Sequence, residues 1–181
     1  MRKVLGLLAA VALCLPVGVI SAGSAGAANT VLPKCKSLTG TQTYKPGLPP
    51  VSSNKLVKPV TTTNALIKGC VGGGITSGKS SGSLKATTGT NCKKLIADTG
   101  KPGKPTHAKI TWSNGQTSTV SNTITVTGST PTALKAKLVT KYTGGLGKGK
   151  TVTAQILATP NKGYCTSAPL NKVTFKSTSI K

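Results

Sequence analysis

One glycine-rich segment of this chain matches a known phosphate-binding motif. Residues 73–80, GGITSGKS, match the phosphate-binding pattern G-x-x-x-x-G-K-[ST], with Gly73, Gly78, Lys79 and Ser80 at the required spacing. In that pattern, backbone N–H groups and the lysine hold the phosphates of a nucleotide, and a helix begins directly after the loop. The residues that follow, SSGS, are weak helix formers.

Acidic residues, which nucleotide chemistry needs to hold magnesium, are almost absent. Asp98 is the one acidic residue of the chain, and it lies in the turn-like stretch IADTGKPG. We therefore interpret residues 72–82, GGGITSGKSSG, as a flexible glycine–serine loop between two strands. We expect no nucleotide and no other cofactor.

Residues for the common hydrolytic mechanisms are equally scarce. A single acidic residue excludes the two-carboxylate mechanism of glycosidases. A serine triad would need His107 and Asp98, nine residues apart, and both have the character of exposed surface positions. One histidine and one aspartate are also too poor a donor set for a metal ion. We therefore expect a protein that is not an enzyme and that holds no metal.

Cysteines are the second group of residues with possible chemical roles, either in disulfides or as metal ligands. The chain has five, and Cys14 lies inside an apolar run near the start. In an exported chain the other four, Cys35, Cys70, Cys92 and Cys165, indicate two disulfides with three possible connectivities. A zinc site would favour the close C-x-x-C spacing, which these four cysteines lack.

The strand pattern around the cysteines favours one connectivity. Residues 35–44 and 61–70 are strand-like, and their antiparallel pairing brings Cys35 beside Cys70, within the distance that a disulfide spans. Cys92 and Cys165 then remain, and their bond ties the NCKKL loop to the segment before the final strand. We expect Cys35–Cys70 and Cys92–Cys165.

The first 27 residues have the three parts of a secretory signal. MRK gives a positive start, an apolar run follows, and SAGSAGAAN supplies small residues for a signal peptidase. Cleavage after Ala27 fits the A-x-A rule, and cleavage after Ala28 fits nearly as well. No later apolar stretch approaches the roughly 20 residues of a membrane span. We therefore predict a secreted protein, extracellular or associated with the cell wall, with one domain over residues 28–181.

Lysine dominates the chemistry of the predicted mature chain. Without residues 1–27 the chain keeps 22 lysines, no arginine and one aspartate, a formal net charge of +21. Such a charge attracts polyanions, although it also keeps a protein soluble. Sequence-specific nucleic-acid binding relies on arginine forks, so we expect anionic wall polymers or acidic polysaccharide instead. The candidate polyanion-binding residues are Lys109, Lys135, Lys137, Lys141, Lys172 and Lys176.

Strands must position these side chains, because apolar and polar residues alternate along most of the chain. AKITW, residues 108–112, places Trp112 on its apolar face, and Asn114-Gly115 after it indicates a hairpin. Residues 133–142, 151–158 and 172–177 alternate in the same way. No segment shows a sustained helical period. About seven to nine strands predict an antiparallel immunoglobulin-like β-sandwich, with Trp112 in its core or at its rim.

The chain as a whole resembles a known class of proteins. The segments GTQTYKPGL, LIKGC, ITWSNGQTSTV, GGLGKGKTVT and YCTSAPLNKVTF, together with the signal peptide and cysteines, resemble those of small secreted β-sandwich proteins of actinobacteria. The resemblance covers about residues 35–175. It implies export and a sandwich fold, and it implies no catalytic residue because the function of that class is unknown.

Two functions fit these features. The first is a non-enzymatic secreted β-sandwich that associates electrostatically with anionic cell-envelope or extracellular polymers. The alternative is an exported effector or protease-inhibitor-like module that presents a disulfide-braced loop to a partner protein, either residues 43–50, TYKPGLPP, or residues 143–151, TGGLGKGKT. Salt separates the two, because surface association weakens as ionic strength rises and loop insertion mostly persists.

Overall fold

The structure of the protein is a computed structural model that describes residues 31–130, 133–160 and 165–181. The predicted signal peptide, residues 1–27, lies outside the described residues, as do both predicted cleavage positions and Cys14.

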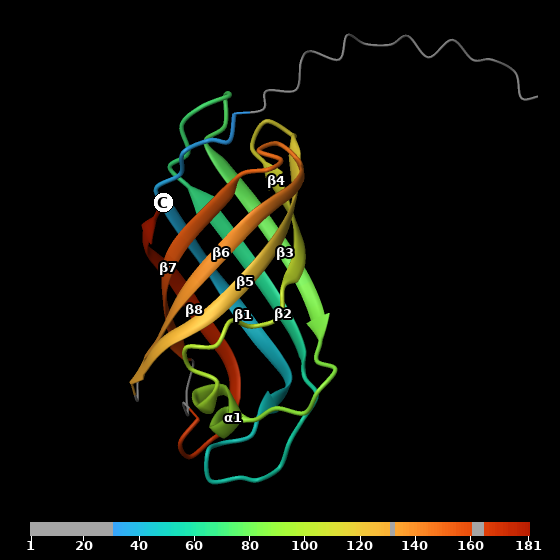
Figure 1. The fold of residues 1–181 in the computed structure, drawn as a ribbon, viewed down its shortest axis with the longest axis vertical. Helices are drawn as coiled ribbons and strands as arrows, with labels where there is room; N and C mark the ends of the chain where they lie inside the picture. Colours follow the sequence, from blue (N-terminus) through green and yellow to red (C-terminus); the bar gives the residue numbers. More distant parts are fainter. Residues whose placement is uncertain (1–30, 131–132, 161–164) are drawn as a thin grey trace, which may run out of the picture.

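Eight antiparallel strands form one closed barrel (Figure 1). Each strand pairs with the next along the chain, and the last strand returns to pair with the first. The strands are β1 (Ser37–Leu48), β2 (Val60–Lys68), β3 (Ser77–Lys85), β4 (Thr106–Trp112), β5 (Thr117–Thr130), β6 (Ala133–Gly145), β7 (Thr151–Pro160) and β8 (Leu170–Ile180). The predicted all-β class, the antiparallel order and the approximate strand number are confirmed.

The predicted immunoglobulin-like sandwich is replaced by this barrel, and the inward residues of the first three strands give a physical reason. Gln42 of β1 faces inward beside Thr63 of β2, and Ser80 and Gly82 of β3 also face inward. Two packed sheets need a dry core of large apolar side chains. Small and polar residues cannot fill such a core, but they suit the wall of a barrel that encloses a cavity.

The strand faces predicted from alternation are correct in β4 and in β6–β8. The predicted apolar faces of residues 133–142 and 151–158 line the barrel interior, and the lysines that alternate with them in residues 133–142 are exposed. The residues of these faces are Leu134, Ala136, Leu138, Tyr142, Val152, Ala154, Ile156 and Ala158. The Asn114-Gly115 hairpin is confirmed as well, since Trp112 N–H donates to the main-chain oxygen of Gln116 (2.9 Å) and Gly115 has a φ of 83°. A glycine adopts this left-handed conformation without steric cost.

The predicted glycine–serine loop at residues 72–82 is wrong in its second half, where β3 begins at Ser77. Gly78 pairs with Ile67 of β2 and with Trp112 of β4. A Cβ atom on Gly78 would lie 2.7 Å from Trp112 Cε3, so the glycine makes room for the indole ring. Packing therefore accounts for a glycine of the phosphate-binding pattern, and a strand stands where that pattern requires a helix.

A short helix, α1 (Cys92–Ala97), replaces the predicted NCKKL loop below the barrel (Figure 1). Its N-cap is Asn91, whose side-chain oxygen accepts a hydrogen bond from Lys94 N–H (2.9 Å). Asparagine is among the preferred N-cap residues because its side chain satisfies an unpaired N–H of the first turn. Six residues are too few to show a helical period in the sequence.

An apolar cluster packs at each end of the barrel, and each cluster contains a disulfide. The upper cluster consists of Cys70, Ile75, Ile110, Trp112, Val120, Tyr142 and Leu146. The lower cluster consists of Leu48, Cys92, Cys165, Leu170 and Val173. Both predicted bonds are present, Cys35–Cys70 at the upper end and Cys92–Cys165 at the lower end. Paired disulfides are typical of chains that fold in an oxidising compartment, such as the cell exterior.

A buried chain of hydrogen bonds holds the upper cluster together. Trp112 Nε1 donates to Ser118 Oγ (2.8 Å), and Ser118 Oγ donates to the main-chain oxygen of Leu146 (2.7 Å). Ser118 has no exposed surface, and Trp112 is 3 % exposed. The predicted core position of Trp112 is therefore confirmed, and a serine of the neighbouring strand satisfies its N–H group.

Candidate functional site

The barrel encloses a cavity of about 860 Å³. Pockets that bind small molecules have volumes of roughly 300–1,000 Å³, so this cavity is of ligand size. Side chains from all eight strands line it, and most of them are apolar; the larger ones include Leu38, Ile67, Ile124, Leu138, Ile156 and Phe175.

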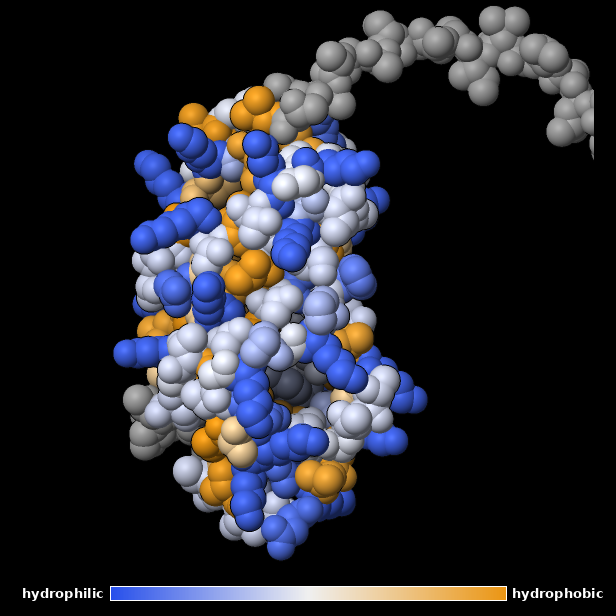
Figure 2. Space-filling view, in the orientation of Figure 1, coloured by the Kyte–Doolittle hydropathy of each residue, from blue (hydrophilic) through white to orange (hydrophobic). Residues whose placement is uncertain are grey.

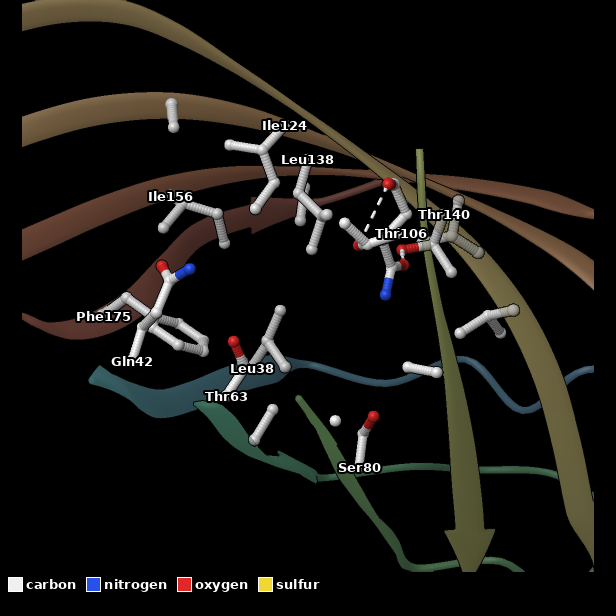
Figure 3. Close-up of a pocket in the computed structure, with 18 of the residues that line it drawn as sticks. Leu38, Gln42, Thr63, Ser80, Thr106, Ile124, Leu138, Thr140, Ile156 and Phe175 are labelled. Carbon is white, nitrogen blue, oxygen red and sulfur yellow. Dashed lines mark hydrogen bonds between the residues drawn. The ribbon is translucent and has the colours of Figure 1, made fainter. Parts of the chain in front are cut away.

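The exposure of one inward residue shows that side chains leave the middle of the barrel unfilled. Ile124 of β5 points into the barrel, yet 44 % of its surface is accessible. Figure 3 shows Ile124, Leu138 and Ile156 on one wall, with Phe175 across the cavity from them. An isoleucine is normally buried in a packed core. Here it borders an open space, which is the condition for a ligand to reach it.

A gap in strand pairing connects this space to the outside. β3 continues to Lys85, but it pairs with β4 only from Gly78 to Ser81. Beyond this point Ser83 and His107, whose register directs them outward, both line the cavity, which indicates that the two strands separate. Figure 2 shows a hollow in this part of the surface, near the lower end of β3 and α1. We call this gap the portal.

The segment that follows α1 forms the other side of the portal. Gly100 N–H donates to the main-chain oxygen of Val126 (2.7 Å), and Gly103 N–H donates to that of Ile124 (2.8 Å). The segment therefore extends the wall along β5, in line with β4. Leu84 of β3 lies at the opposite side and is 51 % exposed. An exposed leucine at the mouth of an apolar cavity is suited to contact an apolar molecule on its way in.

Two groups of neighbouring polar side chains lie on the inner wall, which Thr61 of β2 and Ser80 of β3 line as well. On one side Thr106 of β4, Asn122 of β5 and Thr140 of β6 are cross-strand neighbours. On another side Gln42 of β1 neighbours Thr63 of β2. Figure 3 shows Gln42 and Thr63 near Phe175, with Thr106 and Thr140 at a distance from them. All five side chains of the two groups are uncharged.

The charged residues that line the cavity belong to the segments outside the strands. They are Lys34, Asp98, Lys101 and Lys181. Asp98 accepts a hydrogen bond from Lys101 Nζ (3.4 Å), and both side chains are well exposed. Apart from His107 of β4 at the portal, the barrel wall therefore offers hydrogen bonds but no charge to a ligand.

Two tyrosines with perturbed acidity stand at the ends of the cavity. Burial raises the pKa of Tyr44 and that of Tyr142 to about 12, because the phenolate loses its hydration in an apolar surrounding. Both phenols are neutral at physiological pH. They add hydrogen-bonding groups to the lining without adding charge.

Five of the six predicted polyanion-binding lysines lie on the outer faces of two strands, and the register places Lys135 and Lys176 nearest to each other. Lys135, Lys137 and Lys141 lie on the outer face of β6, while Lys172 and Lys176 lie on β8, two strands away. Lys135 and Lys176 both neighbour Leu157 of β7, so their backbones are separated by two strand spacings, roughly 10 Å. Figure 2 shows hydrophilic side chains spread over the face that carries β5–β7.

The other residues and loops singled out in the sequence lie in different parts of the structure. Lys109 lies apart from these five lysines, on β4. His107 and Asp98 both border the portal, but Asp98 is hydrogen-bonded to Lys101 and the described contacts join neither residue to the other. Of the two candidate loops, TYKPGLPP is mostly strand, because β1 extends to Leu48. TGGLGKGKT forms the turn between β6 and β7, where Leu146 is buried in the upper cluster.

Sequence reasoning missed the cavity, the portal and the inward polar residues. One signal was available, because glutamine, asparagine and threonine alternate with outward residues in β1, β2, β5 and β6. That pattern is unusual for a dry core. It does not reveal a cavity unless the strands are known to close into a barrel.

Comparisons with protein-family models, curated proteins and solved structures found no match for this chain. The resemblance to small secreted actinobacterial proteins therefore stays a prediction. Among the described residues, no helix has the length and apolarity needed to cross a membrane.

Proposed function

We propose that the protein binds a small, mainly apolar molecule inside the barrel and admits it through the portal between β3 and β4. The observation that carries this proposal is the cavity of about 860 Å³ with its mainly apolar wall. Replacing water in such a space by an apolar molecule is favourable, because apolar surface on both sides is removed from water. A barrel of eight strands has the interior width to hold one small ligand.

Two features of the ends support this role. The upper and lower clusters, each with its disulfide, hold the ends in place while the middle of the barrel stays open. A preformed site binds more tightly than one that must become ordered on binding. The scarcity of carboxylates and histidines supports a binding protein rather than an enzyme.

Filling the cavity tests the proposal. Ala136 lines it from β6, next to Ile156 of β7, so Ala136→Phe places an aromatic ring in the ligand's space. The matched control is Gln155→Phe, because Gln155 is exposed on the outer face of β7. We expect wild type and Gln155→Phe to bind the uncharged dye Nile red with a blue-shifted emission, and Ala136→Phe to bind it at least tenfold more weakly. Equal binding by a folded Ala136→Phe variant would place the dye outside the barrel.

We propose as a second function that the outer lysines associate with anionic wall polymers or acidic polysaccharide. Supporting this, every described lysine is exposed except Lys172, which is half-buried. The one aspartate lies at the portal and is paired with Lys101, so the lysines of β6 and β8 have no acidic side chain among them. Such a surface attracts polyanions through long-range electrostatics.

Charge substitution tests this second function. Lys135, Lys137 and Lys141 are replaced together by Gln, and the control replaces Lys55, Lys58 and Lys93, which lie in or beside the lower loops and carry the same charge. Retention on an anionic wall polymer should fall more in the β6 variant than in the control. Equal losses would show that only net charge matters. Retention that survives about half-molar salt would contradict an electrostatic mechanism, since the Debye length there is only a few ångström.

A further inference from the structure

Asn122 is the polar residue of the cavity wall whose hydrogen bonds are best defined. It faces inward from β5, between Thr106 and Thr140. The hydroxyl of Thr140 donates to Asn122 Oδ1 (2.8 Å), and the hydroxyl of Thr106 donates to the main-chain oxygen of Asn122 (3.3 Å). The side-chain oxygen of Asn122 is therefore engaged by the wall itself.

The other end of the same amide remains available to a ligand. Within the described residues, Asn122 Nδ2 donates to no protein acceptor, although Asn122 lines the cavity. An amide nitrogen carries two donor hydrogens and no acceptor lone pair. The bond from Thr140 engages one lone pair of Asn122 Oδ1, whereas both hydrogens of Nδ2 are left without a protein acceptor among the described residues, so a donor is what Asn122 chiefly offers to the space inside the barrel.

The surroundings of this donor restrict the ligand further. The inward residues nearest along the strands are apolar, with Ile124 and Leu138 following Asn122 and Thr140 toward the lower end. The charged groups of the lining belong to segments outside the strands. A carboxylate beside Asn122 would lose its hydration without a cation beside it on the barrel wall, which is strongly unfavourable.

We propose that the ligand is an uncharged, mainly apolar molecule with a carbonyl oxygen, such as a ketone, an ester or a quinone, and that this oxygen accepts a hydrogen bond from Asn122 Nδ2. The proposal rests on the proposed binding of an apolar molecule in the cavity. A pure hydrocarbon would remove water from Asn122 Nδ2 without replacing its hydrogen bond, and a buried donor without a partner is destabilising. A carbonyl group supplies that partner.

A matched series of ligands tests the chemistry. The ligands are n-tridecane, 2-tridecanone, 2-tridecanol and tridecanoate, which share one chain length and differ in their polar group. Binding is followed through the emission of Trp112, the single tryptophan, which also lines the cavity, and through the rise in melting temperature that a bound ligand causes. Each ligand is measured with wild type and with Asn122→Leu, which keeps the side-chain size but removes the amide.

Asn122→Leu should weaken the binding of 2-tridecanone by about 3–10-fold, which corresponds to the usual net contribution of one hydrogen bond. The affinity for n-tridecane should stay unchanged or rise. Thr140→Val, which removes the bond that orients the amide, should reduce the preference for the ketone only in part. Thr61→Val, a cavity-lining substitution on β2, is the control and should leave the ratio of ketone to alkane affinity unchanged. Asn122→Ala replaces the leucine variant if the latter does not fold.

The outcomes separate the two proposals. If none of the four ligands changes the emission or the melting temperature of wild type, binding inside the barrel is refuted together with the carbonyl preference. If ligands bind but Asn122→Leu leaves the ketone-to-alkane ratio unchanged, the cavity binds apolar molecules and the role of Asn122 is wrong. If Asn122→Leu loses affinity for 2-tridecanol alone, the amide presents its oxygen to the ligand and not its nitrogen. If wild type binds tridecanoate more tightly than the ketone, the proposal of an uncharged ligand is refuted.

Discussion

Ser118→Ala should be among the most destabilising single-atom changes in this barrel. Its hydroxyl is the middle of the buried chain from Trp112 Nε1 to the main-chain oxygen of Leu146. Alanine occupies the same space less one oxygen, so the change leaves packing nearly intact. It removes the partner of one donor and of one acceptor at the same time.

The magnitude follows from the burial of these groups. Ser118 has no exposed surface, so water does not reach either orphaned group without an opening of the upper cluster. Each buried polar group without a partner costs about 1–3 kcal/mol. With partial relaxation we expect a loss of about 2–4 kcal/mol in the free energy of unfolding, which corresponds to roughly 5–15 °C in melting temperature for a chain of this size.

Equilibrium unfolding in urea, followed by Trp112 emission and by circular dichroism, measures the loss. Ser121→Ala is the matched control, because Ser121 lies on the same strand with its side chain on the outer face. The control should change the free energy of unfolding by less than about 0.5 kcal/mol. If Ser118→Ala costs no more than the control, the hydrogen-bond chain does not stabilise the upper cluster and the reasoning from burial fails.

Three further changes have defined outcomes. Burial raises the pKa of Tyr142 to about 12, against about 10 in an unfolded chain, so its contribution to stability is complete below pH 10 and is lost as the pH rises toward 12. Between pH 10 and pH 12 the free energy of unfolding, measured in urea, should therefore fall in wild type by up to about 2–3 kcal/mol more than in Tyr142→Phe. Equal decreases in the two proteins would contradict the raised pKa. Replacing Cys92 and Cys165 by Ala should cost about 4 kcal/mol, since the bond closes a loop with a sequence separation of 73, and a thermal scan showing no change would refute the estimate. Gly78→Ala should cost about 1–3 kcal/mol, because the added Cβ lies 2.7 Å from the tryptophan ring, whereas Gly82→Ala, with 3.8 Å to its nearest neighbour, should be nearly neutral in the same assay.

Several elements of the fold could be predicted from local patterns. Alternation in residues 133–142 places side chains on two faces whatever the strand pairs with, because successive residues of a strand point in opposite directions. The Asn114-Gly115 hairpin depends only on residues next to one another. The Cys35–Cys70 bond follows from the pairing of two neighbouring strands. These features depend on short-range geometry, which the order of residue types expresses directly.

β3 and α1 could not be predicted from local patterns, because neither sequence shows a clear preference for strand or helix. β3 contains four serines and two glycines, and its neighbours β2 and β4 make it a strand by supplying hydrogen bonds on both sides. The helix α1 has six residues, and its N-cap and its disulfide to Cys165 hold it in place. In both elements tertiary contacts outweigh weak intrinsic preferences.

The alternation of residue types was enough to predict the inward and outward faces of β4 and β6–β8, the Asn114-Gly115 hairpin and the lysines on the outer face of β6. Closure of the sheet depends on long-range contacts, since the pairing of β1 with β8 joins residues such as Thr39 and Lys176 that are far apart in the chain. Alternation is the same in a sandwich and in a barrel, because both bury one face of each strand. Closure turns the inward face into the wall of a cavity, and that is how Asn122 and Gln42 come to border a space of ligand size rather than a packed core.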